Sequence, residues 1–440
     1  MKISLSVLLF CLPFALIAQN EGQSGIRFEN LPTWNAVLAK AKQEGKYVFV
    51  DCFTTWCGPC KRMDKDIYPI DSIGKFFDEH FISIKVQMDS SATADNEAIR
   101  SWYADAHQIQ REYKVSSFPS YLFFSPDGKL VHRSMAYKDS KNFSILAHNA
   151  IDPQKQYYTR LEKFHQGTLA YSDMPEVVAI AERLQDTNTA VAVAKTYINS
   201  YLLELPEKDL YTYGNIVFIG THLQGSKDRA FQLFYLHGAR VDSAIKTPNY
   251  ARNSVDLILE REEIDQVLYA GSKPFRLRTG EAPDWNRIER SIKKKYNADY
   301  AGRVVLWAKI KWLEYKKDWP QYCNNVILKV EKYGPYYKYG PFMILSEDTR
   351  FNSSAWEIFS YSTDRGQLEK ALAWSEKVIK NTPEPNSEYF DTYANLLYKL
   401  GRKEEALAYE EKAIALNPKA EDIAGNLAKI KKGEPTWPNE

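Results

Sequence analysis

Cysteine is scarce, since this chain of 440 residues contains only five. Cys11 lies in an apolar N-terminal segment, and the other four are Cys52, Cys57, Cys60 and Cys323. So few cysteines exclude a small secreted fold held together by many disulfides. Only Cys57 and Cys60, separated by two residues, form an obvious pair, and we interpret Cys52 and Cys323 as small core residues.

An excess of charge of one sign is also lacking. The chain has 58 basic and 56 acidic residues, a net charge of +2, without long blocks of either sign. This balance gives no electrostatic reason to propose nucleic acid or a membrane surface as a partner. The sequence also lacks a glycine-rich phosphate-binding loop. The hydrophobic content of 44% and charged content of 26% are ordinary for globular proteins, and the length predicts two or three domains.

The only long apolar run of interest is at the N-terminus. Ile3–Ile17 is almost continuously apolar, follows a lysine and ends at Ala18 before polar sequence. This pattern predicts a signal peptide over residues 1–18 with cleavage after Ala18, and therefore an exported, most naturally periplasmic, protein. An uncleaved anchor is the alternative, although the run is shorter than the ~20 residues of a membrane span. The bulky Phe10 before Cys11 argues against a lipid-modified cysteine.

The cysteine pair follows a predicted strand and begins a predicted helix. Tyr47–Val50 is apolar, β-branched and aromatic, which indicates a buried strand. A helix N-terminus favours an anion, so we expect Cys57 to be an acidic and nucleophilic thiol. Cys60, one turn further on, is placed to resolve a mixed disulfide on Cys57. Pro59 suits a first helical turn, and Gly58 leaves Cys57 open to another protein.

Two other interpretations of the pair stay open. A zinc site would need four ligands, and no second Cys-x-x-Cys or pair of histidines follows at a usable spacing, so we expect no metal. A purely structural disulfide would close so short a loop that it would add little stability.

Trp56-Cys57-Gly58-Pro59-Cys60-Lys61 after a strand resembles the thioredoxin family. The resemblance implies an α/β domain over residues 28–152, with a central mixed sheet flanked by helices. It also implies that the redox-active disulfide Cys57–Cys60 serves the chemistry without a separate cofactor.

Further positions match the family pattern. Asp51 matches the buried carboxylate that accepts the proton of Cys60, and Lys85 matches the lysine that pairs with that carboxylate. Phe118-Pro119 matches the loop whose cis-proline faces the cysteines and presents backbone groups to a substrate strand. From the residues alone, Asp51 could instead cap a strand, Lys85 could extend to solvent and Pro119 could be trans.

The resemblance also implies a substrate-binding surface around the cysteines. The residues expected to form it are Trp56, Gly58, Pro59, Phe118 and Pro119.

The hydrophobic pattern predicts the other elements of this domain. They are a helix over 31–44 capped by Thr33, strands over 47–52 and 81–88 (the second alternating between two faces), a long or doubled helix within 89–117, a hairpin of 121–124 and 130–133 with Asp127-Gly128 at its turn, and a closing helix over 141–150.

Strand signals largely vanish after Asp152-Pro153, which predicts an all-α remainder. Within it, residues 366–383 and 401–418 align at an offset of 35 residues and resemble tetratricopeptide repeats, with Ala371 and Ala406 at the close crossing. We therefore expect a helical region of degenerate repeats over 153–350, two repeats over 351–420 and a capping helix over 421–432. The concave face of such an array could bind a protein partner.

The sequence as a whole favours an exported thiol–disulfide oxidoreductase acting on protein thiols and disulfides. Because reduction in an oxidising compartment consumes electrons, the enzyme would need an external electron donor, or an acceptor in the opposite direction. The alternative is an interaction scaffold, in which the repeats hold a partner and the thioredoxin-like unit is a peptide-binding platform. Peroxide reduction is disfavoured because no separate peroxidatic cysteine is evident.

Overall fold

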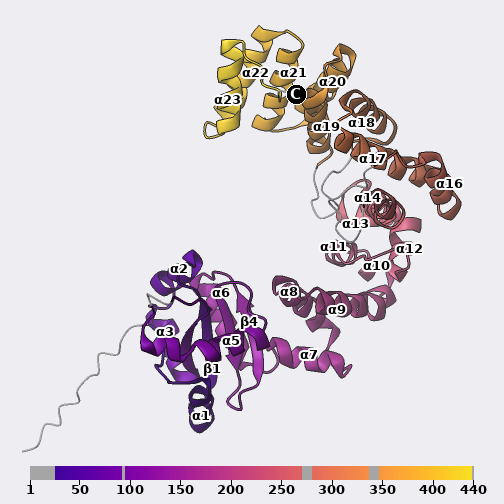
Figure 1. The fold of residues 1–440 in the computed structure, drawn as a ribbon. Helices are drawn as coiled ribbons and strands as arrows, with labels where there is room; N and C mark the ends of the chain where they lie inside the picture. The colour runs from indigo at the N-terminus through magenta and orange to yellow at the C-terminus, as the bar shows by residue number, and fades with distance from the viewer. Residues whose placement is uncertain (1–24, 92–94, 270–279, 336–345, 439–440) are drawn as a thin grey trace, which may run out of the picture. The chain divides into compact units, whose positions relative to one another are not determined.

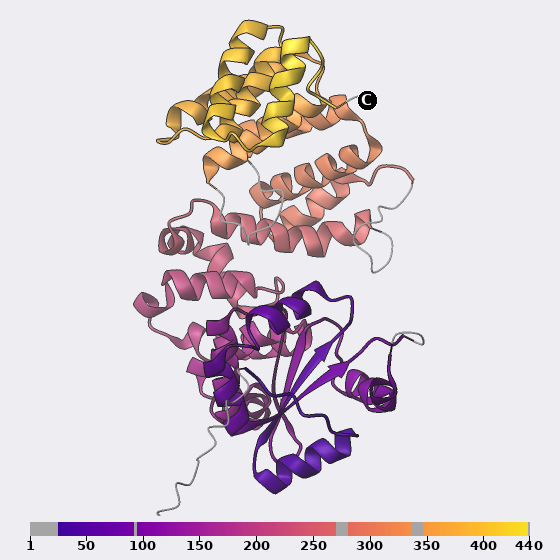
Figure 2. The same ribbon diagram turned by 90° about the vertical axis from the view of Figure 1, so that its left-hand side faces the viewer.

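The computed structural model of the chain describes residues 25–91, 95–269, 280–335 and 346–438 and divides into two compact units, residues 1–197 and 198–440 (Figures 1 and 2). The predicted signal peptide, residues 1–18, lies outside the described residues.

The first unit is built on a mixed sheet. Among the described residues its strands are β1 (Tyr47–Phe53), β2 (Phe81–Gln87), β3 (Ser120–Phe124) and β4 (Leu130–Met135), in the order β2-β1-β3-β4. β1 is parallel to β2 and antiparallel to β3, and β4 is antiparallel to β3. The sheet and the β3–β4 hairpin confirm the sequence predictions.

Helices cover both faces of this sheet, as Figure 2 shows for the strands and the surrounding helices. The helices are α1 (Trp34–Glu44), α2 (Gly58–Asp66), α3 (Asp71–His80), α4 (Glu97–Ser101), α5 (Tyr103–Glu112) and α6 (Ser140–Ile151). Apolar residues of α1 and α5 pack with Val50 and Ile84 on one face, and those of α2, α3 and α6 pack with Phe49 and Phe123 on the other.

This double coverage buries both faces at the start of β2. Phe81 and Ser83, on the face opposite Ile82 and Ile84, are 3% and 2% exposed. They are buried because the face they share with Phe49 packs under α3. The predicted doubled helix within 89–117 is confirmed as α4 and α5, which meet at Trp102.

The first unit continues beyond residue 152 with α7 (Tyr157–His165), α8 (Met174–Arg183) and most of α9 (Thr187–Ser200). The backbone N–H of Tyr157 donates to Nδ1 of His132 in β4 at 3.0 Å. Arg160 in α7 forms an ion pair with Glu176 in α8 at 2.6 Å. These contacts cover the outer side of the edge strand β4, which would otherwise be open to pairing.

The second unit consists of helices, which confirms the prediction that the chain after Asp152-Pro153 is α-helical. They are α10 (Glu207–Leu210), α11 (Tyr213–Thr221), α12 (Arg229–Leu236), α13 (Gly238–Ile245), α14 (Tyr250–Leu259), α15 (Asp265–Leu268), α16 (Trp285–Lys295), α17 (Ala298–Lys316), α18 (Trp319–Tyr333), α19 (Glu347–Tyr361), α20 (Arg365–Asn381), α21 (Ser387–Lys399), α22 (Lys403–Leu416) and α23 (Glu421–Lys432). A search of the described residues finds no helix with the length and apolar character that crossing a membrane requires.

The repeat-like segments near the C-terminus are α20 and α22. Each packs against the helix before it, so that α19 with α20 and α21 with α22 form helical hairpins. Ala371 and Ala406 are both fully buried. Small side chains at these positions let paired helices approach closely, although the assignment to the tetratricopeptide family stays a prediction.

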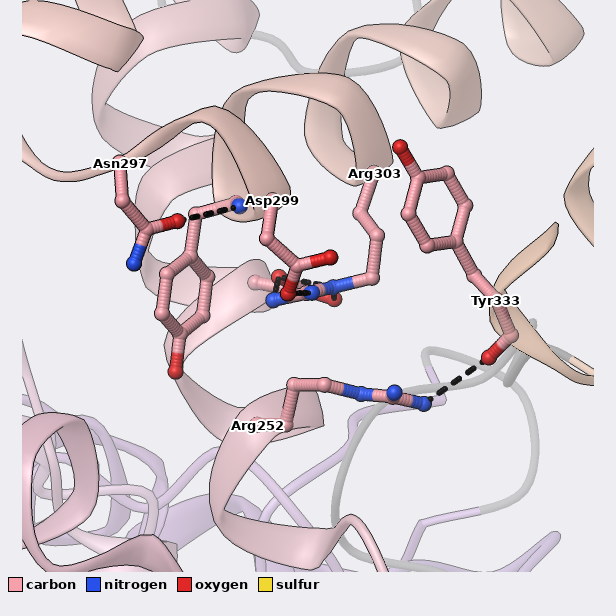
Figure 3. A network of polar contacts seen from close by, with 7 residues as sticks. Arg252, Asn297, Asp299, Arg303 and Tyr333 are labelled. Atoms are coloured by element: carbon pink, nitrogen blue, oxygen red, sulfur yellow. Dashed lines mark hydrogen bonds and ion pairs between the residues drawn. The ribbon is translucent and has the colours of Figure 1, made fainter.

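A buried ion network joins three helices of the second unit (Figure 3). The guanidinium of Arg303 in α17 is 2% exposed, donates to Asp256 of α14 at 2.8 Å and pairs with Asp299. Arg252 of α14 donates to the backbone carbonyl of Tyr333 in α18 at 3.1 Å. The buried cation is therefore matched by carboxylates, as burial of a charge requires.

We predict that Gly74→Ala destabilises the first unit. A Cβ on Gly74 would lie 2.2 Å from the carbonyl oxygen of Gly25, so one of the two backbones must shift. Either α3 moves, or the segment of Gly25 and Ile26 moves, which is held by the hydrogen bond from the Ile26 N–H to the Tyr68 carbonyl. We expect a loss on the order of 2 kcal/mol in the free energy of unfolding. Urea denaturation measures this loss, and hydrogen exchange at Ile26 reports the local shift.

Lys75→Ala, an exposed position on the same helix, is the matched control and should change stability by less than about 0.5 kcal/mol. Equal stability of the two variants would contradict the packing described for Gly25 and Gly74.

Candidate functional site

Cys57 and Cys60 form a disulfide at the start of α2, with their Cα atoms 5.3 Å apart. Cys57 is the N-cap of the helix, and its Sγ accepts a hydrogen bond from the backbone N–H of Cys60 at 3.1 Å. The predicted position of the pair at a helix N-terminus is confirmed. In the reduced protein the same N–H and the helix dipole would stabilise a thiolate on Cys57.

The zinc interpretation gains no geometric support. The two sulfurs are bonded to each other, and in the parts of the chain that the structure describes no group of three or more His, Cys, Asp or Glu side chains could hold a metal ion.

Cys57 is less accessible than expected from the small side chain of its neighbour Gly58. Gly58 and Pro59 are exposed, and a Cβ on Gly58 would meet no atom within 4 Å. Cys57 itself is only 2% exposed and Cys60 only 3%. The disulfide lies against the first turn of α2, so a substrate sulfur must approach along a restricted path beside Gly58 and the exposed ring of Trp56.

The Phe118-Pro119 loop lies beside the cysteine motif. The peptide bond between these residues is cis, as the resemblance implied. The Phe118 ring meets the Trp56 ring edge to face, with centroids 6.0 Å apart. The carbonyl oxygen of Pro119 accepts from the N–H of Ala136 at 2.9 Å, which ties the loop to the end of β4. The structure thus brings the Phe118 ring, next to Pro119, against Trp56 of the cysteine motif, and the substrate-binding role of this surface stays a prediction.

Asp51 lies in β1 with its side chain 1% exposed, directly between Lys85 of β2 and Tyr121 of β3. Lys85 Nζ is 3.6 Å from Asp51 Oδ2, so the expected ion pair is present, and the ammonium also pairs with Asp64. Burial raises the pKa of Asp51 to about 6, and the Lys85 ammonium and the nearby Tyr68 hydroxyl partly oppose this rise.

Two tyrosines near Asp51 were not singled out from the sequence. Neither Asp51 Oδ1 nor the hydroxyls of Tyr68 and Tyr121, all buried, complete a direct hydrogen bond within the described residues. The position of Tyr121 could have been inferred by pairing the strand after Pro119 with β1, whereas Tyr68 reaches the site from the loop after α2.

Cys52 and Cys323 are free, buried thiols. Burial raises the pKa of Cys52 well above its usual value and that of Cys323 to about 12. Both therefore remain protonated and unreactive, which agrees with their interpretation as core residues.

Comparison with known proteins places residues 34–151 in a family model described as a thioredoxin-like domain. A thioredoxin H-type from Fagopyrum esculentum is 30% identical over 119 residues, which are 27% of this chain and 85% of that protein. The thiol:disulfide interchange protein DsbD of Pseudoalteromonas atlantica is 28% identical over 141 residues, 31% of this chain and 22% of that protein.

Among solved structures, a putative disulphide-isomerase from Bacteroides thetaiotaomicron has 30% identity and a TM-score of 0.23, with 29% of this chain and 90% of that chain covered. A DsbH oxidoreductase has 19% identity and a TM-score of 0.26, with 34% of this chain and 94% of that chain covered. The family match ends at residue 151 and does not extend into the later helices.

We predict that the free energy of unfolding falls as pH rises from about 4 to about 6, because the buried Asp51 carboxyl must lose its proton in the folded state. In this range the folded state holds a proton on Asp51 that the unfolded chain has lost, so the free energy of unfolding falls with pH. A pKa raised from 3.8 to about 6 corresponds to a loss on the order of 3 kcal/mol. Asp51→Asn should therefore be more stable than the parent at pH 7.5 by about 1–3 kcal/mol, with the difference vanishing near pH 4.

Urea denaturation of both oxidised proteins at pH 4 and pH 7.5 measures this difference. Asp64→Asn, which removes the exposed carboxylate paired with the same lysine, is the control and should change stability by less than about 1 kcal/mol. An Asp51→Asn protein less stable than the parent at pH 7.5 would refute the assigned cost of burial.

Proposed function

Residues 34–151 make this chain a member of the thioredoxin-like family, and we propose that it is an exported enzyme that reduces or isomerises disulfides in other proteins. The chain is a thiol–disulfide oxidoreductase. One observation carries the proposal: a disulfide lies at the N-terminus of α2 beside a cis-proline loop, with a buried carboxylate in the adjoining strand.

In the proposed reducing cycle, the Cys57 thiolate attacks one sulfur of a substrate disulfide. A Cys57–substrate disulfide forms and the other substrate sulfur leaves as a thiolate. Cys60 then transfers its proton to Asp51 and attacks Cys57 Sγ, which releases the second substrate sulfur. Two electrons pass to the substrate, and the enzyme is left with the Cys57–Cys60 disulfide that the structure contains.

The residues around the dithiol have supporting roles in this proposal. Lys85 stabilises the ionised form of Asp51 before the proton arrives. The exposed surface of Trp56, Gly58 and Pro59, together with Phe118 and Pro119, receives an extended substrate segment. An external thiol donor must reduce Cys57–Cys60 after each cycle, and an external acceptor would drive the opposite direction.

Export to the periplasm is supported by the N-terminal sequence, residues 1–18, with its apolar run and small residue at the proposed cleavage position. The Gly-Pro pair between the cysteines supports reduction or isomerisation over oxidation by its resemblance to reducing thioredoxins.

A second candidate function is a scaffold, which is favoured by the helical hairpins α19 with α20 and α21 with α22. Hairpins stacked in this way present surfaces that often bind proteins. Replacement of both Cys57 and Cys60 by serine separates the two functions. Retained biological activity would favour the scaffold, and lost activity would favour catalysis.

We predict that Cys60→Ser traps substrates on Cys57. Without the resolving thiol the mixed disulfide persists, so covalent adducts should accumulate in an oxidising extract and turnover with a model disulfide protein should be lost. Non-reducing electrophoresis and mass spectrometry of the Cys57 peptide identify the adducts.

Cys323→Ser, a change far along the sequence in α18, is the control for cysteine replacement and should leave both turnover and adduct formation unchanged. The catalytic proposal fails if Cys57 of the Cys60→Ser protein titrates as a free thiol after exposure to disulfide substrates.

A further inference from the structure

A cavity of about 420 Å³ lies at the edge of the first unit, outside the dithiol site. Its walls come from the end of β4, the segment after it, α6 and α8. The residues that the argument uses are His132, Met135, Lys138, Leu146, Ile180 and Arg183. Part of its wall therefore comes from α8, which lies beyond the family match and packs against β4.

The cavity carries an excess of positive charge. Lys138 and Arg183 both line it, and Lys138 Nζ donates to the backbone carbonyl of Met135 and not to a carboxylate. The carboxylate of Glu176, which also lines the cavity, is already paired with Arg160 at 2.6 Å. Burial and the neighbouring Arg183 lower the pKa of Lys138, so an anion brought between the two cations would relieve their repulsion.

His132 adds a neutral donor to this wall. Burial lowers the pKa of its imidazole to about 4, so the ring is uncharged at neutral pH. Because Nδ1 accepts from the N–H of Tyr157 at 3.0 Å, the ring proton is on Nε2. Leu146 and Ile180 supply an apolar wall. The combination fits a carboxylate on a short aliphatic stem.

The strand end that lines the cavity is bonded to the Pro119 loop, which is the loop that receives the substrate in the proposed function. Met135 pairs with Ser120, the residue after Pro119, and Ala136 donates to the Pro119 carbonyl at 2.9 Å. Lys138 Nζ in turn donates to the Met135 carbonyl at 2.5 Å. From α2, the guanidinium of Arg62 lies 4.5 Å from the centre of the Tyr137 ring.

We propose that this cavity is a subsite for an acidic side chain of the protein substrate, an Asp or Glu a few residues from the disulfide being reduced. The inference rests on the proposed function, since it requires a polypeptide lying across the Pro119 loop. An extended chain advances about 3.3 Å per residue, so a side chain two to five residues from the reacting cysteine can leave the loop and reach the cations. Lys138 and Arg183 are thereby specificity-determining residues.

A peptide series tests the subsite. Disulfide peptides that differ only by Glu or Gln at each position two to five residues from the cysteine are mixed with the reduced full-length enzyme, and the released thiol gives the second-order rate constant of a single turnover. With the parent enzyme, Glu at one or two positions should raise this constant about tenfold, as expected for a charge-assisted contact.

Lys138→Gln and Arg183→Gln should each remove most of this preference while leaving the rate with the Gln peptides unchanged. The double variant Lys138→Glu, Arg183→Glu should instead favour Lys-bearing peptides. Lys141→Gln, an exposed lysine on α6 outside the cavity, is the matched control and should keep the full preference for Glu.

The subsite is refuted if the parent reduces Glu and Gln peptides equally, or if the preference survives both single variants. It is also refuted if inorganic phosphate binds to the parent and Lys138→Gln abolishes this binding while no preference for Glu is found, because the cavity would then hold a free anion. Failure of the parent to reduce any peptide, with Cys57 fully reduced, would refute the proposed function instead.

Discussion

The chemistry of this protein depends on the N-terminus of α2. Because Cys57 caps the helix, its sulfur accepts the Cys60 N–H at 3.1 Å and lies at the positive end of the helix dipole. The same turn holds the Cα atoms of the two cysteines 5.3 Å apart, and the two sulfurs are bonded to each other. β1 and the Pro119 loop adjoin this turn: β1 carries the buried carboxylate of Asp51, and the loop places the Phe118 ring against Trp56.

The base is held at a cost in stability. Asp51 is buried beside Tyr68 and Tyr121, and Lys85, its ion-pair partner among the described residues, is shared with Asp64. Burial raises the pKa of Asp51 to about 6, and the Lys85 ammonium opposes this rise only in part. A fully paired Asp51 would make the domain more stable, but in the proposed cycle it would be too weak a base to take the proton of Cys60.

The sequence was sufficient to predict features set by local pattern. The strand before the motif, the helix it opens, the hairpin at Asp127-Gly128 and the cap at Thr33 each follow from a few neighbouring residues. It was not sufficient for features set by packing between distant segments. Tyr68 reaches Asp51 from the loop after α2, and the burial of Ser83 depends on helices from other parts of the chain, so no local period could reveal either.

The family match and the folded unit end at different residues. The family match stops at residue 151, yet α7 and α8 complete the same folded body by hydrogen bonding to His132 and covering β4. An edge strand protected in this way is less prone to pair with another chain. The covering helices also place Arg183 near Lys138 and so give the sheet edge a charge that β4 and α6 would not have alone. The extension therefore alters the surface at the end of β4, which the hydrogen bond from Ala136 to the Pro119 carbonyl ties to the Pro119 loop.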